Sequence, residues 1–194
     1  MKTIVIFILM LTIAVSNAFS QETTMKYTPT KKHPFGQYNP KAPKQLLDYK
    51  DLIGSSKCES ISRNPDQSWA KPVKMIWKWK YILNGHAIQD ETLKEDGTHS
   101  GSIRQYDKDS LQWNVHYYTT RKASLKLPVW NGNKNKEGNI VLYKKQKAPN
   151  GTDGFYRLTF YEISKKGYKW VGEWVDTTEK IVFLTWKISC TKED

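Results

Sequence analysis

Short functional motifs are missing from this chain of 194 residues. The sequence contains no Gly-x-Ser-x-Gly nucleophile elbow and no phosphate-binding loop. Histidine is scarce, and no two histidines have the spacing of a metal-ligand motif. These absences exclude the enzyme classes that carry linear signatures, so we expect a non-catalytic protein without a metal or cofactor. The four histidines are His33, His86, His99 and His116.

Long apolar runs are also missing, except near the start of the chain. Lys2 precedes an apolar run over residues 4–15, and the small residues Ala18 and Ser20 flank a plausible cleavage point. This run is shorter than the roughly 20 residues that a spanning helix needs. The pattern predicts a secretory signal peptide over residues 1–20, with no membrane span after its removal and a periplasmic or extracellular product.

Cysteine occurs twice, as Cys58 and Cys190. In an exported chain the oxidising compartment favours a disulfide between them, the alternative being two free thiols. The two residues lie at the start of the first predicted strand and the end of the last. A bond between them would join the two ends of a closed sheet.

Acidic residues are outnumbered: 19 Asp and Glu stand against 31 Lys and Arg, for a net charge of +12. Basic residues interleaved with aromatics over residues 77–81 are a pattern found in nucleic-acid-binding proteins. Alternation puts these lysines and aromatics on opposite faces, however, and export removes most nucleic acid partners. Lysine clusters at residues 144–147 and 165–169 indicate a solvated surface, with weak polyanion binding as an open alternative.

Strand patterns, in contrast, are abundant. Between Lys71 and Leu83 apolar and aromatic residues alternate with lysines, which is the period of a half-buried strand. Asn84-Gly85 follows at once and predicts a hairpin turn. The resulting register puts Trp77 opposite Thr92, Trp79 opposite Asp90, Tyr81 opposite Ile88, Lys74 opposite Glu95 and Lys78 opposite Glu91.

Further turn signals delimit about nine or ten strands after Cys58. We expect a flexible leader over residues 21–43, a helix of about ten residues from residue 44 that caps one end of the sheet, and a single domain over residues 44–194. The simple hairpin order favours a monomeric, antiparallel up-and-down β-barrel over a sandwich. A three-residue loop over residues 108–110 would pair Gln105 with Trp113 on the inner side.

The pattern resembles a known family of secreted bacterial proteins, domain-of-unknown-function family 1579, which is itself similar to the calycin group of lipocalins and fatty-acid-binding proteins. The resemblance implies an up-and-down barrel and supplies no catalytic residue. Ser56 stands where the calycin Gly-x-Trp opening needs Trp. The matching pieces are Leu52-Ile53-Gly54, residues 83–91, residues 101–107 before Trp113, and residues 167–174.

Aromatic residues are plentiful, with 8 Trp, 11 Tyr and 6 Phe, and most Trp fall on the apolar side of their strands. They either fill the barrel or line an open lumen that binds a small hydrophobic or amphipathic molecule. The alternative is a glycan-binding or protein-interaction module with exposed aromatics such as Trp69 and Trp130. The lumen candidates are Trp77, Trp79, Tyr81, His86, Asp90, Gln105, Trp113, Tyr117, Trp170 and Trp174.

Overall fold

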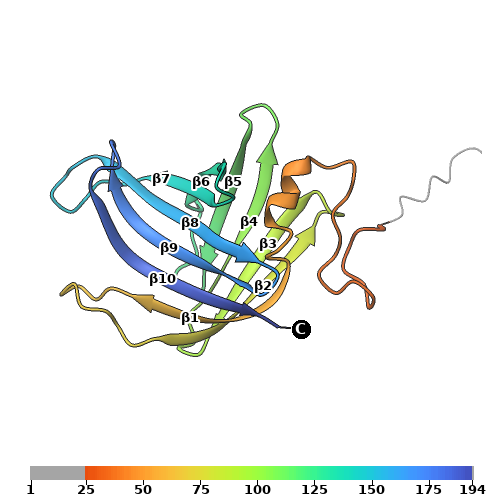
Figure 1. The fold of residues 1–194 in the computed structure, drawn as a ribbon, viewed down its shortest axis with the longest axis horizontal. Helices are drawn as coiled ribbons and strands as arrows, with labels where there is room; N and C mark the ends of the chain where they lie inside the picture. The colour runs from red at the N-terminus through yellow and green to blue at the C-terminus, as the bar shows by residue number, and fades with distance from the viewer. Residues whose placement is uncertain (1–24, 194) are drawn as a thin grey trace, which may run out of the picture.

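Ten antiparallel strands close into one barrel in the computed structural model, which describes residues 25–193. The predicted all-β barrel is confirmed, and the predicted signal peptide lies outside the described residues. Each strand pairs with its neighbours in sequence, and the last pairs with the first (Figure 1). The strands are β1 (Gly54–Ser62), β2 (Val73–Ile82), β3 (Ala87–Lys94), β4 (His99–Asp107), β5 (Gln112–Thr119), β6 (Val129–Lys134), β7 (Ile140–Lys145), β8 (Gly154–Ser164), β9 (Gly167–Asp176) and β10 (Val182–Lys192).

The barrel closes between β1 and β10, and a disulfide joins these two strands. Cys58 stands directly opposite Cys190 in the register, and their sulfur atoms are bonded. The predicted disulfide is therefore confirmed. It lies inside the buried core next to Met75, which pairs with Cys58 from β2.

The β2–β3 hairpin has the predicted register, with Trp77 opposite Thr92 and Trp79 opposite Asp90. The turn takes up residues 83–86, where Leu83 and Asn84 both have φ 51° and Gly85 has φ 81°. A Cβ at Gly85 would lie 2.5 Å from the carbonyl oxygen of Gln37. Only glycine fits here, because the N-terminal segment runs close against the turn.

The predicted β4–β5 register is wrong by one residue. Residues 108–111 form a four-residue loop rather than a three-residue one, so Gln105 pairs with Asn114 and Tyr106 pairs with Trp113. A slip of one residue moves every side chain of a strand to the other face. Gln105 is accordingly exposed, and Arg104 points into the barrel.

A short 3-10 helix, η1 (Lys44–Tyr49), closes one end of the barrel as predicted (Figure 1). The expected ten-residue helix is wrong: the chain turns after Tyr49, and the amide of Leu52 donates to the Tyr49 carbonyl at 2.9 Å. This turn lets Leu52 face the barrel together with Leu46 and Tyr49. All three side chains are fully buried.

Residues 25–43 pack against the same end of the barrel. The Tyr27 amide donates to Asn84 Oδ1 at 2.9 Å, and the Tyr81 amide donates to the Phe35 carbonyl at 2.9 Å. Asn39 and Ala42 are buried. The prediction of a flexible, exposed leader is therefore wrong for this part, because its backbone supplies hydrogen bonds to the outer end of the β2–β3 hairpin.

Candidate ligand-binding cavity

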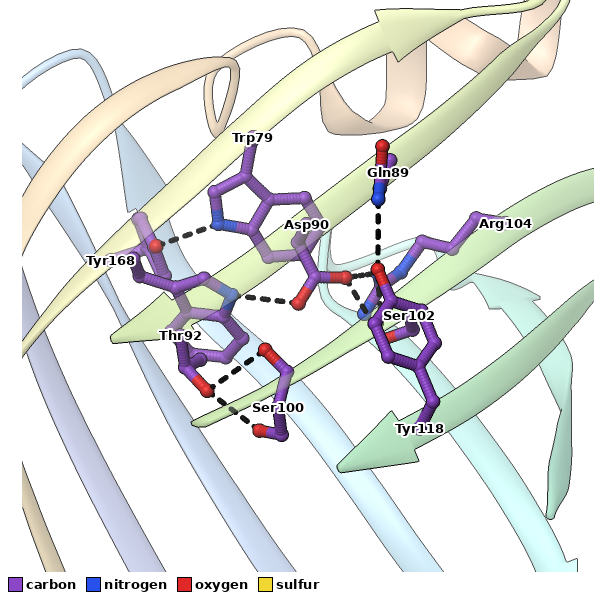
Figure 2. Close-up of polar contacts among 10 residues, drawn as sticks. Trp79, Gln89, Asp90, Thr92, Ser100, Ser102, Arg104, Tyr118 and Tyr168 are labelled. Carbon is purple, nitrogen blue, oxygen red and sulfur yellow. Dashed lines mark hydrogen bonds and ion pairs between the residues drawn. The ribbon is translucent and has the colours of Figure 1, made fainter. Parts of the chain in front are cut away.

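The half of the barrel interior next to η1 is filled with aromatic rings. The Tyr49 ring lies 4.9 Å from that of Trp113, and the Trp79 ring lies 5.5 Å from that of Phe160, both edge to face. The indole N–H of Trp79 donates to Tyr168 Oη at 2.9 Å (Figure 2). Edge-to-face packing of this kind leaves no room for a ligand.

The other half of the interior holds a cavity of about 180 Å³. Lys94, Ser100, Tyr117 and Trp186 line both this cavity and a second hollow that continues past Thr98 and Arg121 in the adjoining loops. The cavity thus faces the end of the barrel opposite η1, which we call the mouth. Its aromatic lining residues are Trp77, Tyr117, Trp130, Tyr156, Phe160, Trp170 and Trp186.

One side of the cavity is polar, and its centre is the carboxylate of Asp90 (Figure 2). Asp90 accepts hydrogen bonds from Trp77 Nε1 at 2.8 Å and from Ser102 Oγ at 2.9 Å, and it forms an ion pair with Arg104. The Arg104 and Asp90 side chains are only 3% and 4% exposed. A buried charge needs such partners, and here β2 and β4 supply them to the carboxylate on β3.

Arg104 lies between the cavity and the filled half. Its guanidinium carbon is 4.4 Å from the ring centroid of Trp79 and 5.3 Å from that of Tyr49, within the range of a cation–π interaction. Burial lowers the pKa of Arg104 from its ordinary value, while Tyr49 acts in the opposite direction. An arginine side chain stays protonated in proteins. The guanidinium therefore forms a cationic floor under the cavity.

Further polar groups continue from this floor to the mouth. Thr92 Oγ1 and Ser100 Oγ are 2.6 Å apart on β3 and β4. Lys94 lies over Trp186, its Nζ 4.7 Å from the ring centroid, and burial lowers the pKa of Lys94. Across the barrel, Trp130 is 8% exposed and its indole N–H has no hydrogen-bond partner among the described residues. The Trp130 ring thus contributes to the cavity wall, while its indole nitrogen is itself buried.

Seven of the ten lumen candidates from the sequence are buried or partly buried inside the barrel, at different depths. Four of them line the cavity. Trp79 and Trp113 belong to the filled half, where Trp113 Nε1 donates to Asp48 Oδ2 at 3.2 Å. Tyr81 is buried where residues 25–43 cross the barrel end. The four candidates in the cavity wall are Trp77, Asp90, Tyr117 and Trp170.

The placement of three candidates in the lumen is wrong. His86 is exposed in the β2–β3 turn, where its Nε2 lies 3.1 Å from Asn39 Nδ2. Gln105 is exposed because of the shifted register. Trp174 is not part of the cavity wall; its indole N–H donates to the Gln146 carbonyl at 2.9 Å, just past the end of β7.

The two aromatics that the sequence analysis suggested as exposed behave differently from each other. Trp130 is buried in the cavity wall, which corrects that expectation. Trp69 is partly exposed, but it packs against two cations, with Arg63 at 4.4 Å and Lys187 at 4.0 Å from its ring centroid. Of the two aromatic residues suggested for an outer binding surface, only Trp69 is accessible from outside the barrel.

Arg104 is the main site residue that sequence reasoning missed. A signal was present, because a buried carboxylate such as Asp90 needs a cationic or donor partner. Arg104 is also the only arginine between Arg63 and Arg121. The wrong β4–β5 register turned Arg104 outward, and Ser102 was missed with it because both lie on the same face of β4.

Within residues 25–193, no group of three or more His, Cys, Asp or Glu side chains is arranged to hold a metal ion. No helix in that range is both long and apolar enough to cross a membrane.

Among known proteins, only solved structures are similar to this chain, and the similarity is distant. No family model matches the sequence, and no curated protein matches it. Among solved structures, the chain is similar to the S-type phycobiliprotein lyase CPES from Guillardia theta, with 8% identity and a TM-score of 0.48. The match covers 78% of this chain and 98% of that one. The assignment as a closed antiparallel barrel rests on the strand pairing described above.

Proposed function

We propose that the barrel reversibly binds a small, mostly apolar molecule in its cavity, without catalysis. The observation that carries this proposal is the cavity itself, with aromatic walls on one side and the Asp90–Arg104 pair on the other. Ligand sites are typically apolar with a few placed polar groups. An amphipathic molecule satisfies both sides of this cavity at once.

The size of the cavity limits the ligand. Drug-sized ligands occupy pockets of roughly 300–1,000 Å³, whereas an engineered apolar cavity of roughly 150 Å³ binds benzene. A volume of about 180 Å³ therefore suits one or two rings or a short chain.

The chemistry of Asp90 supports binding rather than catalysis. Its carboxylate accepts hydrogen bonds from Trp77, Ser102 and Arg104, which engage three of its roughly four lone-pair sites. A general base needs a free position near a substrate proton. Asp90 instead orients the donors around it, and we propose that it holds the cavity floor in place.

Titration of the protein with octanoate, octanol and a malto-oligosaccharide tests this proposal. We expect a saturable change in tryptophan fluorescence with the two eight-carbon molecules and none with the sugar, because four tryptophans line the cavity. A response to the sugar alone would support an outer aromatic surface and end the lumen proposal.

A matched pair of variants on β8 locates the site. Leu158 lines the cavity, and Thr159 is the next residue, on the outer face of the same strand. We expect Leu158→Trp to weaken octanol binding in calorimetry by filling the cavity, and Thr159→Trp to leave it unchanged. Equal affinities of the two variants would place the ligand elsewhere.

We also propose that the protein acts as an exported monomer. The Cys58–Cys190 disulfide supports an oxidising compartment, where such bonds persist. N-terminal sequencing of the natural protein is the direct test, with Gln21 expected as the first residue. A natural protein that retains residues 1–20 would contradict export by cleavage.

A further inference from the structure

The loop of residues 120–128, between β5 and β6, carries exposed leucines. Leu125 has a relative exposure of 107%, and Leu127 of 37%. The strands on either side of the loop supply Tyr117 and Trp130 to the cavity wall. The loop therefore projects from the mouth of the barrel, next to the entrance of the cavity.

The same loop is basic. It contains Arg121, Lys122 and Lys126 and no acidic residue. None of these three cations forms an ion pair with a carboxylate of residues 25–193. Arg121 also lines the hollow at the mouth together with Lys94, so the positive charge continues to the cavity entrance.

We propose that residues 120–128 dock the mouth of the barrel onto an anionic lipid surface. Anionic lipids attract basic segments, and exposed apolar side chains between the basic residues insert at the boundary between headgroups and acyl chains. A contact with a soluble polyanion would use the cations and leave Leu125 in water. The leucines at the tip of a basic loop thus favour a membrane over a polyanion.

This docking is independent of which molecule occupies the cavity. The cavity entrance would face the lipid surface, so an apolar ligand could pass between membrane and barrel without crossing water. A cavity that binds nothing would leave the lipid contact intact, and the two proposals therefore fail separately.

Sedimentation with lipid vesicles at low salt tests the proposal on the chain from Gln21 onward. We expect binding to vesicles that contain phosphatidylglycerol and none to vesicles of phosphatidylcholine alone. Each cation near an anionic surface contributes about a fivefold change in affinity, so Arg121→Gln, Lys122→Gln and Lys126→Gln together should weaken binding by about a hundredfold. Leu125→Ser with Leu127→Ser should also weaken it.

Matched controls lie at the opposite end of the barrel. Lys165 and Lys166 are exposed in the β8–β9 turn, and Leu111 is 64% exposed in the β4–β5 loop. We expect Lys165→Gln with Lys166→Gln, and separately Leu111→Asn, to leave vesicle binding unchanged. Asparagine suits position 111, where φ is 53°. Thermal unfolding of every variant confirms that the loop changes leave the fold intact.

Three results would overturn the proposal. The first is an absence of binding to phosphatidylglycerol vesicles. The second is an equal loss of binding in the control variants, which would indicate a contribution from net charge alone. The third is full binding by the variant that lacks Leu125 and Leu127, which would indicate a polyanion contact without insertion.

Discussion

Replacement of Arg104 by Met tests whether the buried ion pair stabilises the barrel as its geometry indicates. The change keeps a long side chain over Trp79 but removes the charge that faces Asp90. Asp90, at 4% exposure, would then keep only the neutral donors of Trp77 and Ser102, so it must either stay charged without a counter-charge or take up a proton. The variant thus measures the cost of removing the counter-charge from one buried carboxylate.

The expected loss is about 3–5 kcal/mol of unfolding free energy, the usual cost of removing one partner of a buried pair. For a domain of this size each kcal/mol shifts the melting temperature by about 2–4 °C, so Arg104→Met should lower it by about 10 °C. Asp90→Asn should have a similar cost, because it leaves the guanidinium buried without a counter-charge. Chemical denaturation at neutral pH, with the disulfide intact, measures both.

The double variant decides whether the two effects share one cause. Residues of one ion pair are coupled, so Asp90→Asn combined with Arg104→Met should cost about 2 kcal/mol less than the sum of the single variants. Arg104→Lys is the matched control, since it keeps the charge and loses the planar contact with Trp79. Additive single costs, or single costs below about 1 kcal/mol, would refute the reasoning.

Three further predictions concern the closure, the filled half and the β4 register. Replacing Cys58 and Cys190 by Ser should cost about 5 kcal/mol in the chain-entropy model, because the bond spans a separation of 132 residues; urea unfolding measures this. Burial raises the pKa of Tyr49 to about 12 and also raises that of Tyr168. Their contribution to stability is complete below the unfolded-state pKa near 10 and is lost as pH rises through the folded values, so melting temperature should fall above about pH 10. Gln105→Ala should change unfolding free energy by less than about 0.5 kcal/mol, since Gln105 is exposed; a larger loss would contradict the register of β4.

The parts of the fold that the sequence predicts correctly are those with redundant local signals. In the β2–β3 hairpin, the alternation, the Asn84-Gly85 turn and the opposite charges of Lys78 and Glu91 all give one register. The disulfide was predictable from the positions of two cysteines at the two ends of the sheet. Agreement among independent signals is what made these predictions reliable.

The parts of the fold that the sequence predicts wrongly depend on single loop lengths or on contacts between distant residues. One extra residue in the loop after β4 exchanged Gln105 for Arg104 in the interior, and turn composition alone does not fix such a length. The packing of residues 25–43 depends on hydrogen bonds to Asn84 and Tyr81, which lie more than 45 residues away. No periodicity within the segment reports contacts of that range.

The division of the interior follows from side-chain size at each level of the barrel. Near η1 the rings of Trp79 and Phe160 meet across the centre, and the Trp113 ring packs against Tyr49. Toward the mouth, β3 and β4 carry Thr92, Ser100 and other small polar residues, which cannot reach the opposite wall. Counting aromatics along the sequence therefore could not decide between a filled and an open lumen, because the half of the barrel next to η1 is filled and the half toward the mouth is open.

The buried pair has a cost that stability alone does not explain. Apolar residues of similar volume often stabilise a protein as well as a buried ion pair does. We therefore expect Asp90→Leu combined with Arg104→Met to lower the melting temperature less than either single variant does, the remaining loss arising because Trp77 and Ser102 lose their acceptor. The double variant should still bind octanoate more weakly, since the cavity would lose its polar floor. Calorimetric titration of the folded protein with octanoate and with octanol separates a role in ligand binding from a role in stability. Unchanged octanoate affinity in that variant would mean that the pair serves only to fix the packing of β3 against β4.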